Sequence, residues 1–201
     1  MRESSKTKGA PDPRMVVVRE WVEALLWAAF IAFCVVRPFI IQAFKIPTGS
    51  MRMTLLEGDI ILVNKFLYGA KIPFTDFRLP AVRQPRRGDV IVFIYPENPK
   101  KDFIKRLVGL PGETLEIRNG TIYIDGKPLL DPLFSSRYYY NRGGFAPEGK
   151  TIVIPPGNFF MLGDNSASSQ DSRYWGFVPH ANILGKALVV YWPLQRIRMV
   201  K

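Results

Sequence analysis

The stretch TLEIRNGTIYIDG, residues 114–126, contains two short runs of alternating apolar and polar residues, separated by Asn119-Gly120. Alternation with a period of two is typical of a half-buried β-strand, and an Asn-Gly turn between such runs is the strongest short-range signal for a β-hairpin. A second turn signal, Asp125-Gly126, follows at once. The sequence therefore predicts antiparallel β-structure at this point.

Similar patterns occur on both sides of this hairpin. Runs of β-branched residues bounded by turn residues predict further strands at residues 59–63, 88–95, 151–154 and 186–192. The 17 prolines and 16 glycines among the 201 residues suit many short connections. We therefore predict a mainly β protein with helix confined to the N-terminal region. Residues 70–87 and 131–150 are predicted to be long loops.

The N-terminal region holds the one strongly apolar segment of the chain. Residues 24–36 contain no charged or strongly polar residue, and apolar residues resume after Arg37 and Pro38. A membrane span needs about 20 residues, a length that residues 20–42 supply. A cleavable signal peptide, with an apolar stretch of about 7–15 residues, fits the apolar run equally well, but the small-x-small cleavage site is missing. We therefore predict a retained transmembrane signal anchor at residues 20–42.

The charges predict the orientation of this anchor and its surroundings. By the bias of positive charge toward the cytoplasm, residues 1–19 form a basic cytoplasmic tail and residues 43–201 an extracytoplasmic domain. The net charge of +11 suits a lipid bilayer or nucleic acid. No zinc-ligand spacing, aromatic RNA-binding motif or basic-helix pattern occurs, so nucleic acid is not an expected partner. The basic residues of the tail are Arg2, Lys6, Lys8, Arg14 and Arg19.

The scarcity of histidine and cysteine limits the choice of nucleophile. The chain has one histidine, His180, for which we assign no partner and predict a surface position, and one cysteine, Cys34, within the apolar run. Cys34 is expected to serve as a small apolar side chain, and a single cysteine excludes an intrachain disulfide. A serine activated by a lysine needs neither residue. Ser50 follows the apolar segment closely, and Lys105 lies in a strand-like run.

The alternation around Lys105 predicts a partly desolvated amine. Phe103, Lys105 and Leu107 share one strand face. A lysine is a general base only when neutral, and burial lowers its usual pKa of about 10.4 by several units. We therefore hypothesise that Lys105 accepts the proton of Ser50 as this hydroxyl attacks a peptide carbonyl. From spacing alone, a turn serine and a solvated strand lysine are the alternative.

Five blocks in order along the chain are similar to those of the bacterial type I signal (leader) peptidases. These enzymes are Ser-Lys membrane peptidases that remove signal peptides from exported proteins. The blocks cover most of the chain, which makes the resemblance specific. They are residues 46–51 with 54–55, 58–65, 87–93, 104–113, and 163–165 with 171–179.

The resemblance implies a role for four residues. Ser50 is the expected nucleophile and Lys105 the expected general base. The backbone N–H of Ser50 and the hydroxyl of Thr48, where the family usually has serine, are expected to form the oxyanion hole. Ser169 is expected to orient the lysine, with its neighbour Ser168 as the alternative. No cofactor and no metal ion are expected.

Four residues of the last block are expected to have structural roles. We predict that Asp171 and Arg173 form an ion pair that holds their loop, and that Asp164 and Asn165 set a turn near the site. This stretch departs from the family pattern, which has an arginine at the position of Ser166 and an acidic residue after it.

The resemblance also implies an architecture and a location. The expected fold is an antiparallel β-sheet catalytic core with a smaller β insertion at about residues 112–155. The substrate is expected to bind extended, with small side chains at positions −1 and −3 in shallow pockets. A monomer in the bacterial cytoplasmic membrane that acts on signal-peptide-bearing preproteins is the expected form.

Two other classes of function compete with this hypothesis. A self-cleaving Ser-Lys regulator of the LexA-like class shares this kind of β core, but needs a soluble DNA-binding helix pair where this chain has an apolar segment. A membrane-anchored protein that binds exported chains without cutting them is the second alternative. Cleavage of a precursor, and its loss in Ser50→Ala and Lys105→Ala, distinguishes the peptidase from both.

Overall fold

The computed structural model describes residues 13–72, 75 and 77–201. The chain forms two compact units, a first that ends at Arg37 and a second, Pro38–Lys201. All the strands and the predicted catalytic residues belong to the second unit.

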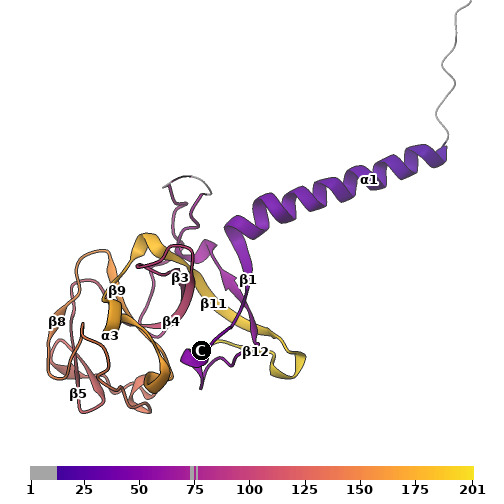
Figure 1. The fold of residues 1–201 in the computed structure, drawn as a ribbon. Helices are drawn as coiled ribbons and strands as arrows, with labels where there is room; N and C mark the ends of the chain where they lie inside the picture. The colour runs from indigo at the N-terminus through magenta and orange to yellow at the C-terminus, as the bar shows by residue number, and fades with distance from the viewer. Residues whose placement is uncertain (1–12, 73–74, 76) are drawn as a thin grey trace, which may run out of the picture. The chain divides into compact units, whose positions relative to one another are not determined.

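The first unit is helical, as predicted for the N-terminal region. Helix α1 (Pro13–Ile31) is followed by a π-helical stretch, η1 (Ala32–Ile40), and α1 is labelled in Figure 1. Its large apolar side chains are solvent-exposed all around the helix, with exposed fractions of 68% for Trp21, 65% for Leu25 and 66% for Trp27. Within the described residues, no helix has both the length and the apolar character that crossing a membrane requires.

The second unit is built on a large antiparallel sheet, which confirms the prediction of a mainly β core. The strand order is β1-β2-β11-β3-β4-β9-β10, and β12 pairs with β11. Figure 1 shows the long strand β11 crossing this body beside β3. The strands are β1 (Ile41–Lys45), β2 (Ile60–Asn64), β3 (Val90–Ile94), β4 (Asp102–Gly109), β9 (Asn158–Leu162), β10 (Val178–Pro179), β11 (Ile183–Trp192) and β12 (Arg198–Met199).

The predicted hairpin belongs to a second, four-stranded sheet with the order β7-β6-β5-β8. Asn119 and Gly120 connect β5 to β6 with φ values of 49° and 73°. Positive φ at both central residues is what a type I′ hairpin turn requires, so the hairpin prediction is confirmed. Figure 1 shows this sheet on the side of the body away from β1 and β12. Its strands are β5 (Thr114–Arg118), β6 (Thr121–Ile124), β7 (Lys127–Pro128) and β8 (Ile152–Val153).

The prediction that helix is confined to the N-terminal region is wrong for two short helices. Helix α2 (Pro132–Ser135) starts where the Asp131 carboxylate accepts a hydrogen bond from Leu133 N, and α3 (Ser172–Trp175) has Asp171 in the same role. A side-chain cap stabilises a single helical turn of this kind. Such a turn is too short to show the apolar periodicity from which a helix is predicted. The 3₁₀ turns are η2 (Gly49–Met51), η3 (Phe66–Tyr68), η4 (Ser166–Ser168), η5 (His180–Asn182) and η6 (Leu194–Arg196).

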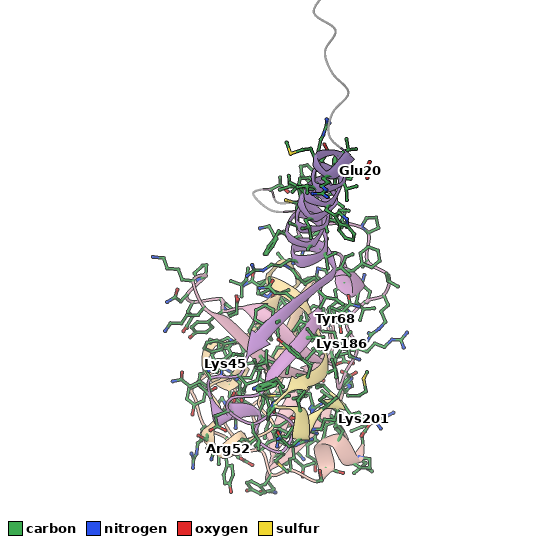
Figure 2. All side chains as sticks on the ribbon, turned by 90° about the vertical axis from the view of Figure 1, so that its right-hand side faces the viewer. Glu20, Lys45, Arg52, Tyr68, Lys186 and Lys201 are labelled. Carbon is green, nitrogen blue, oxygen red and sulfur yellow. The ribbon has the colours of Figure 1, made fainter. Side chains whose placement is uncertain are left out.

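A buried carboxylate joins the long loop after β2 to the main sheet. Asp89 accepts hydrogen bonds at 2.7 Å from both Tyr68 Oη and Lys186 Nζ, and it also pairs with Arg83. Figure 2 shows Tyr68 and Lys186 next to each other. These hydrogen bonds lower the pKa of Asp89 well below its usual range, against the opposing effect of burial. The loop is therefore fastened to β3 and β11 by charge as well as by packing.

Candidate active site

Ser50 lies in the 3₁₀ turn η2, which is held in place by packing in the core and by hydrogen bonds. Met51 and Leu55 are fully buried in the core beneath the turn. From the other side, Asn165 donates its backbone N–H to Ser50 O and its side-chain amide to Gly49 O, both at 3.0 Å. The burial of Met51 and Leu55 and the two hydrogen bonds from Asn165 therefore fix the backbone around Ser50.

Lys105 approaches Ser50 from strand β4. Its Nζ donates a hydrogen bond to Ser50 Oγ at 2.6 Å, and the two side chains are 55 residues apart in the sequence. The lysine is 4% exposed, with Leu107 buried on the same strand face and the Phe103 ring 5.4 Å from Nζ. The desolvation expected from the strand alternation is therefore present.

Burial controls the ionisation of this amine. Removal from water lowers the pKa of Lys105 to about 8. The negative charges of Asp171 and Asp164 raise this pKa, and the positive charge of Arg173 lowers it, with burial the largest effect. A lysine with such a pKa is deprotonated to a useful extent near neutral pH, at a point where it contacts a hydroxyl.

Thr48 lies two residues before Ser50 in extended conformation, with φ −136° and ψ 157°. Its side chain is exposed and does not cap the turn that follows. Thr48 lines a cavity of about 240 Å³ together with Ser50 and Lys105. The other lining residues are Pro47, Asp102, Phe103, Ile104, Ser168 and Gln170.

The two candidates for orienting the lysine differ in burial. Ser169 is 5% exposed, and its Oγ donates a long hydrogen bond of 3.4 Å to Gln170 O, whereas Ser168 is exposed at the cavity wall. Among the hydrogen bonds of the described residues, none joins either serine to Lys105. Ser169 does lie beside the turn that contains Ser50, because a Cβ added to Gly163 would meet Ser169 Oγ at 2.2 Å and Ser50 O at 2.6 Å.

Three of the four residues predicted to be structural belong to buried ion pairs. Asp171 and Arg173 are completely buried, with 2.7 Å between Oδ2 and Nη2, which confirms that prediction. Asn165 precedes the turn η4, as predicted. Asp164 lies with Asn165 in the bend before η4, and its carboxylate also pairs with Arg106 at 2.6 Å, with both side chains 1% exposed, a contact that was not predicted.

His180 does not have the surface position predicted for it. The side chain is half-buried against Phe159, with 6.0 Å between the ring centroids, and burial lowers its pKa. The turn η5 draws the residue inward, since His180 N donates to Gly157 O at 2.8 Å. Among the described residues, no group of three or more His, Cys, Asp or Glu could hold a metal ion.

The family model described as "Signal peptidase, peptidase S26" matches residues 18–192. The chain belongs to the signal peptidase family, S26. It is 36% identical to the signal peptidase I of Pseudomonas aeruginosa over 224 residues, which cover 91% of this chain and 78% of the relative. The probable signal peptidase I-2 of Synechocystis is 31% identical and covers 100% of this chain and 84% of its own length. The crystal structure of a signal peptidase I from Enterococcus faecalis has 36% identity and a TM-score of 0.43, covering 53% of this chain and 98% of that one.

As a member of the signal peptidase family, the chain is a serine peptidase.

The sequence did not reveal two sets of contacts at this site. Thr54 Oγ1 donates to Asp164 and accepts from Arg106, and Asn165 holds the backbone of Gly49 and Ser50. The only signal in the sequence was that Thr54 and Asn165 lie in blocks similar to those of the family. The order of residues does not indicate which backbone oxygen a side-chain amide contacts.

Proposed function

We propose that this family member is a membrane-bound endopeptidase that cleaves signal peptides from exported preproteins, with Ser50 as nucleophile and Lys105 as general base. One observation carries the proposal. Lys105 Nζ and Ser50 Oγ are 2.6 Å apart in a site where both side chains are more than nine-tenths buried. The geometry is within the range that direct proton transfer from hydroxyl to amine requires.

The chemistry follows from the lowered pKa of Lys105. With a pKa of about 8, about a tenth of the amine is neutral at pH 7. The neutral amine accepts the Ser50 proton as Oγ attacks the carbonyl carbon of residue −1, and the resulting ammonium returns a proton to the departing amine. Lys105 then deprotonates a water molecule that hydrolyses the acyl-enzyme, which restores Ser50.

The oxyanion of both tetrahedral intermediates needs donors aimed at it. The Ser50 backbone N–H is one, and the Thr48 hydroxyl is the other. Two facts support Thr48: its side chain lines the same cavity as Ser50, and it does not cap η2. Its additional methyl group restricts the χ1 rotamer, so the backbone must place the hydroxyl toward the reacting carbonyl.

Ser169 is proposed as the residue that orients Lys105. Its side chain is buried beside Gly163 and the backbone of Ser50. The hydrogen bond to Gln170 O is 3.4 Å long and therefore weak, so the hydroxyl is free to turn toward the amine. The exposed Ser168 has more contact with solvent and is the weaker candidate.

The substrate is proposed to bind extended, with the side chain of residue −1 in the 240 Å³ cavity at Ser50. A second cavity of about 40 Å³ adjoins it and shares Pro47, Asp102, Phe103 and Ile104 with the first. In a strand, residues −1 and −3 point to the same side. The second cavity is therefore the proposed −3 pocket, and its small size favours small side chains. Strand β1 ends the sheet order, so its free edge supports binding by strand addition.

Membrane attachment is proposed through residues 20–42. Exposed apolar side chains such as Trp21, Leu25 and Phe33, at 65% or more exposure, support it, because a surface of this kind is stable only against lipid or protein. The basic tail would then be cytoplasmic, and the catalytic unit extracytoplasmic. Flotation of the full chain with lipid vesicles, compared with a chain that starts at residue 43, tests this attachment.

Cleavage of a precursor by the purified full chain in detergent tests the dyad. We expect Ser50→Ala and Lys105→Ala to abolish cleavage. The matched controls are Ser135→Ala and Lys150→Ala, which change exposed residues of the same types and should retain wild-type rates. Cleavage by Lys105→Ala at the control rate contradicts the dyad, and absence of cleavage by the wild type favours a binding protein.

A further inference from the structure

The two cavities define the direction in which a substrate runs across the site. The carbonyl of residue −1 has to meet Ser50, and residue −3 occupies the second cavity. The mature segment, which begins at +1, therefore leaves the site on the side away from the second cavity. The residues of the first cavity that the second does not share include Ser168, the last residue of the turn η4, and Gln170, two residues after it. The mature segment passes this turn.

An exposed aromatic and basic cluster is hydrogen-bonded to η4. Arg142 Nη1 donates to Ala167 O at 2.6 Å, and Tyr140 N donates to Ser166 Oγ at 2.9 Å. The Arg142 guanidinium lies 5.2 Å from the centroid of the Tyr140 ring, and that ring is 4.9 Å from the ring of Tyr138.

The side chains of this cluster are accessible. Tyr138 is 58% and Tyr140 is 42% exposed, and Arg142 is exposed as well. Within the described residues Arg142 makes no ion pair. A positive charge over the Tyr140 ring, with the Tyr138 ring next to it and without a carboxylate partner among the described residues, is suited to bind a peptide that carries acidic side chains.

We infer that Tyr138, Tyr140 and Arg142 form a binding surface for the mature segment of the preprotein, and that Arg142 selects acidic residues a few positions after the cleavage site. The inference rests on the proposed function, since it takes the direction of the substrate from the proposed pockets. The tyrosine rings provide apolar contacts for the mature segment, and Arg142 provides the preference for acidic side chains in that segment.

The distances fit this assignment. Ala167 precedes the cavity residue Ser168, and consecutive Cα atoms are about 3.8 Å apart, so the guanidinium lies within about 10 Å of the cavity. An extended peptide advances about 3.3 Å per residue. Residues +2 to +4 therefore reach Arg142, and the selection should act on those positions and not on +1.

Cleavage of three internally quenched peptides tests the inference. All three have the same signal-peptide segment up to −1, and they carry Asp, Asn or Lys at both +3 and +4. We expect kcat/KM of the wild-type full chain to be about fivefold higher for the Asp than for the Lys peptide, as an exposed ion pair supplies. The ratio should decrease as salt screens the charges. Arg142→Gln, which keeps a donor for Ala167 O, should bring the ratio close to one and leave the Asn peptide within twofold of wild type.

The control is Arg118→Gln, which removes the same charge from an exposed arginine of the smaller sheet and should keep the wild-type ratio. Three outcomes overturn the inference. Equal cleavage of all three peptides by the wild type overturns it and leaves the proposed peptidase intact. An equal loss on all three peptides in Arg142→Gln shows that Arg142 acts through the loop and not on substrate. Failure of the wild type to cleave any peptide overturns the proposed function and the inference with it.

Discussion

Arg106 and Asp164 form a bidentate ion pair in the interior, with 2.7 Å from Nε to Oδ1 and 2.6 Å from Nη2 to Oδ2. The neighbouring cation of strand β4, Lys105, points to the opposite face and contacts Ser50. The two adjacent basic side chains are therefore in different environments. The arginine pairs with a carboxylate, and the lysine is desolvated with its pKa lowered.

Loss of the arginine should leave Asp164 buried without its main partner. We expect Arg106→Met to lower the free energy of unfolding by about 3–5 kcal/mol, the cost of breaking a buried ion pair from one side. Urea unfolding measures this change. The control, Arg118→Met, breaks an exposed pair with Glu116 and should cost less than about 1 kcal/mol. Equal losses in the two variants would contradict the assignment.

Lys105 should reduce stability at neutral pH. Burial lowers its pKa from 10.5 to about 8, so between these values the unfolded chain binds the proton that the folded chain has lost. The free energy of unfolding therefore rises with pH across this window. Lys105→Met should stabilise the fold by about 3 kcal/mol at pH 7, and the gain should shrink toward pH 10. Unfolding at several pH values measures it, with Lys150→Met as the exposed control. A gain that is independent of pH would rule out the shift.

Thr48 should contribute to the rate through its hydroxyl. Thr48→Val keeps the branched shape and removes the donor, so we expect kcat to fall about 10²–10³-fold with KM little changed, as for other oxyanion-hole donors. Thr48→Ser keeps the donor and should retain most activity. Steady-state kinetics on one precursor peptide measures both variants, and a valine variant as active as the serine variant would remove Thr48 from the oxyanion hole.

Ser169 should affect the ionisation of Lys105 as well as the rate. If its hydroxyl orients the amine, Ser169→Ala lowers kcat by about tenfold or more and shifts the pH dependence of kcat/KM, because a hydrogen bond to the amine is lost. Ser168→Ala should leave the pH profile at its wild-type position. The reverse result would assign the orienting role to Ser168.

Gly163 should tolerate no side chain. An added Cβ would lie 2.2 Å from Ser169 Oγ and 2.6 Å from Ser50 O, so the turn that carries Ser50 would have to move. We expect Gly163→Ala to reduce kcat by at least about 10²-fold, since small displacements of reacting groups cost this much. Gly144→Ala meets no atom within 4 Å and serves as the matched control. Similar activity of the two variants would show that the turn adapts.

Local features of the fold follow from the sequence where neighbours in the chain decide the structure. The Asn119-Gly120 turn is one case, because the left-handed conformation that it needs is a property of those two residues. Burial of Lys105 is another, because alternation along one strand places it between apolar neighbours. The helices α2 and α3 were not predicted because each has only four residues and is stabilised by one capping carboxylate, so neither is long enough to show a helical periodicity of apolar residues.

Long-range contacts of the site could not be predicted in this way. Asp164 has the local composition of a turn residue, and its role as the partner of Arg106 depends on two strands meeting 58 positions apart. The same holds for His180, whose half-buried position depends on the packing of η5 against Phe159. Side-chain partners of this kind are chosen by the sheet order, which no periodicity encodes.

By itself, the sequence determined the β class, the Asn119-Gly120 hairpin and the apolar N-terminal segment, and it supplied the residues proposed as nucleophile and base. Each of these depends on a local pattern or on which functional groups the chain possesses. Only the tertiary structure decided that Lys105 Nζ lies 2.6 Å from Ser50 Oγ and that Asn165 holds the backbone beside it. The physical reason is that desolvation and hydrogen-bond geometry arise when distant segments pack together, and the antiparallel sheet is what brings β4, η2 and the loop after β9 to one place.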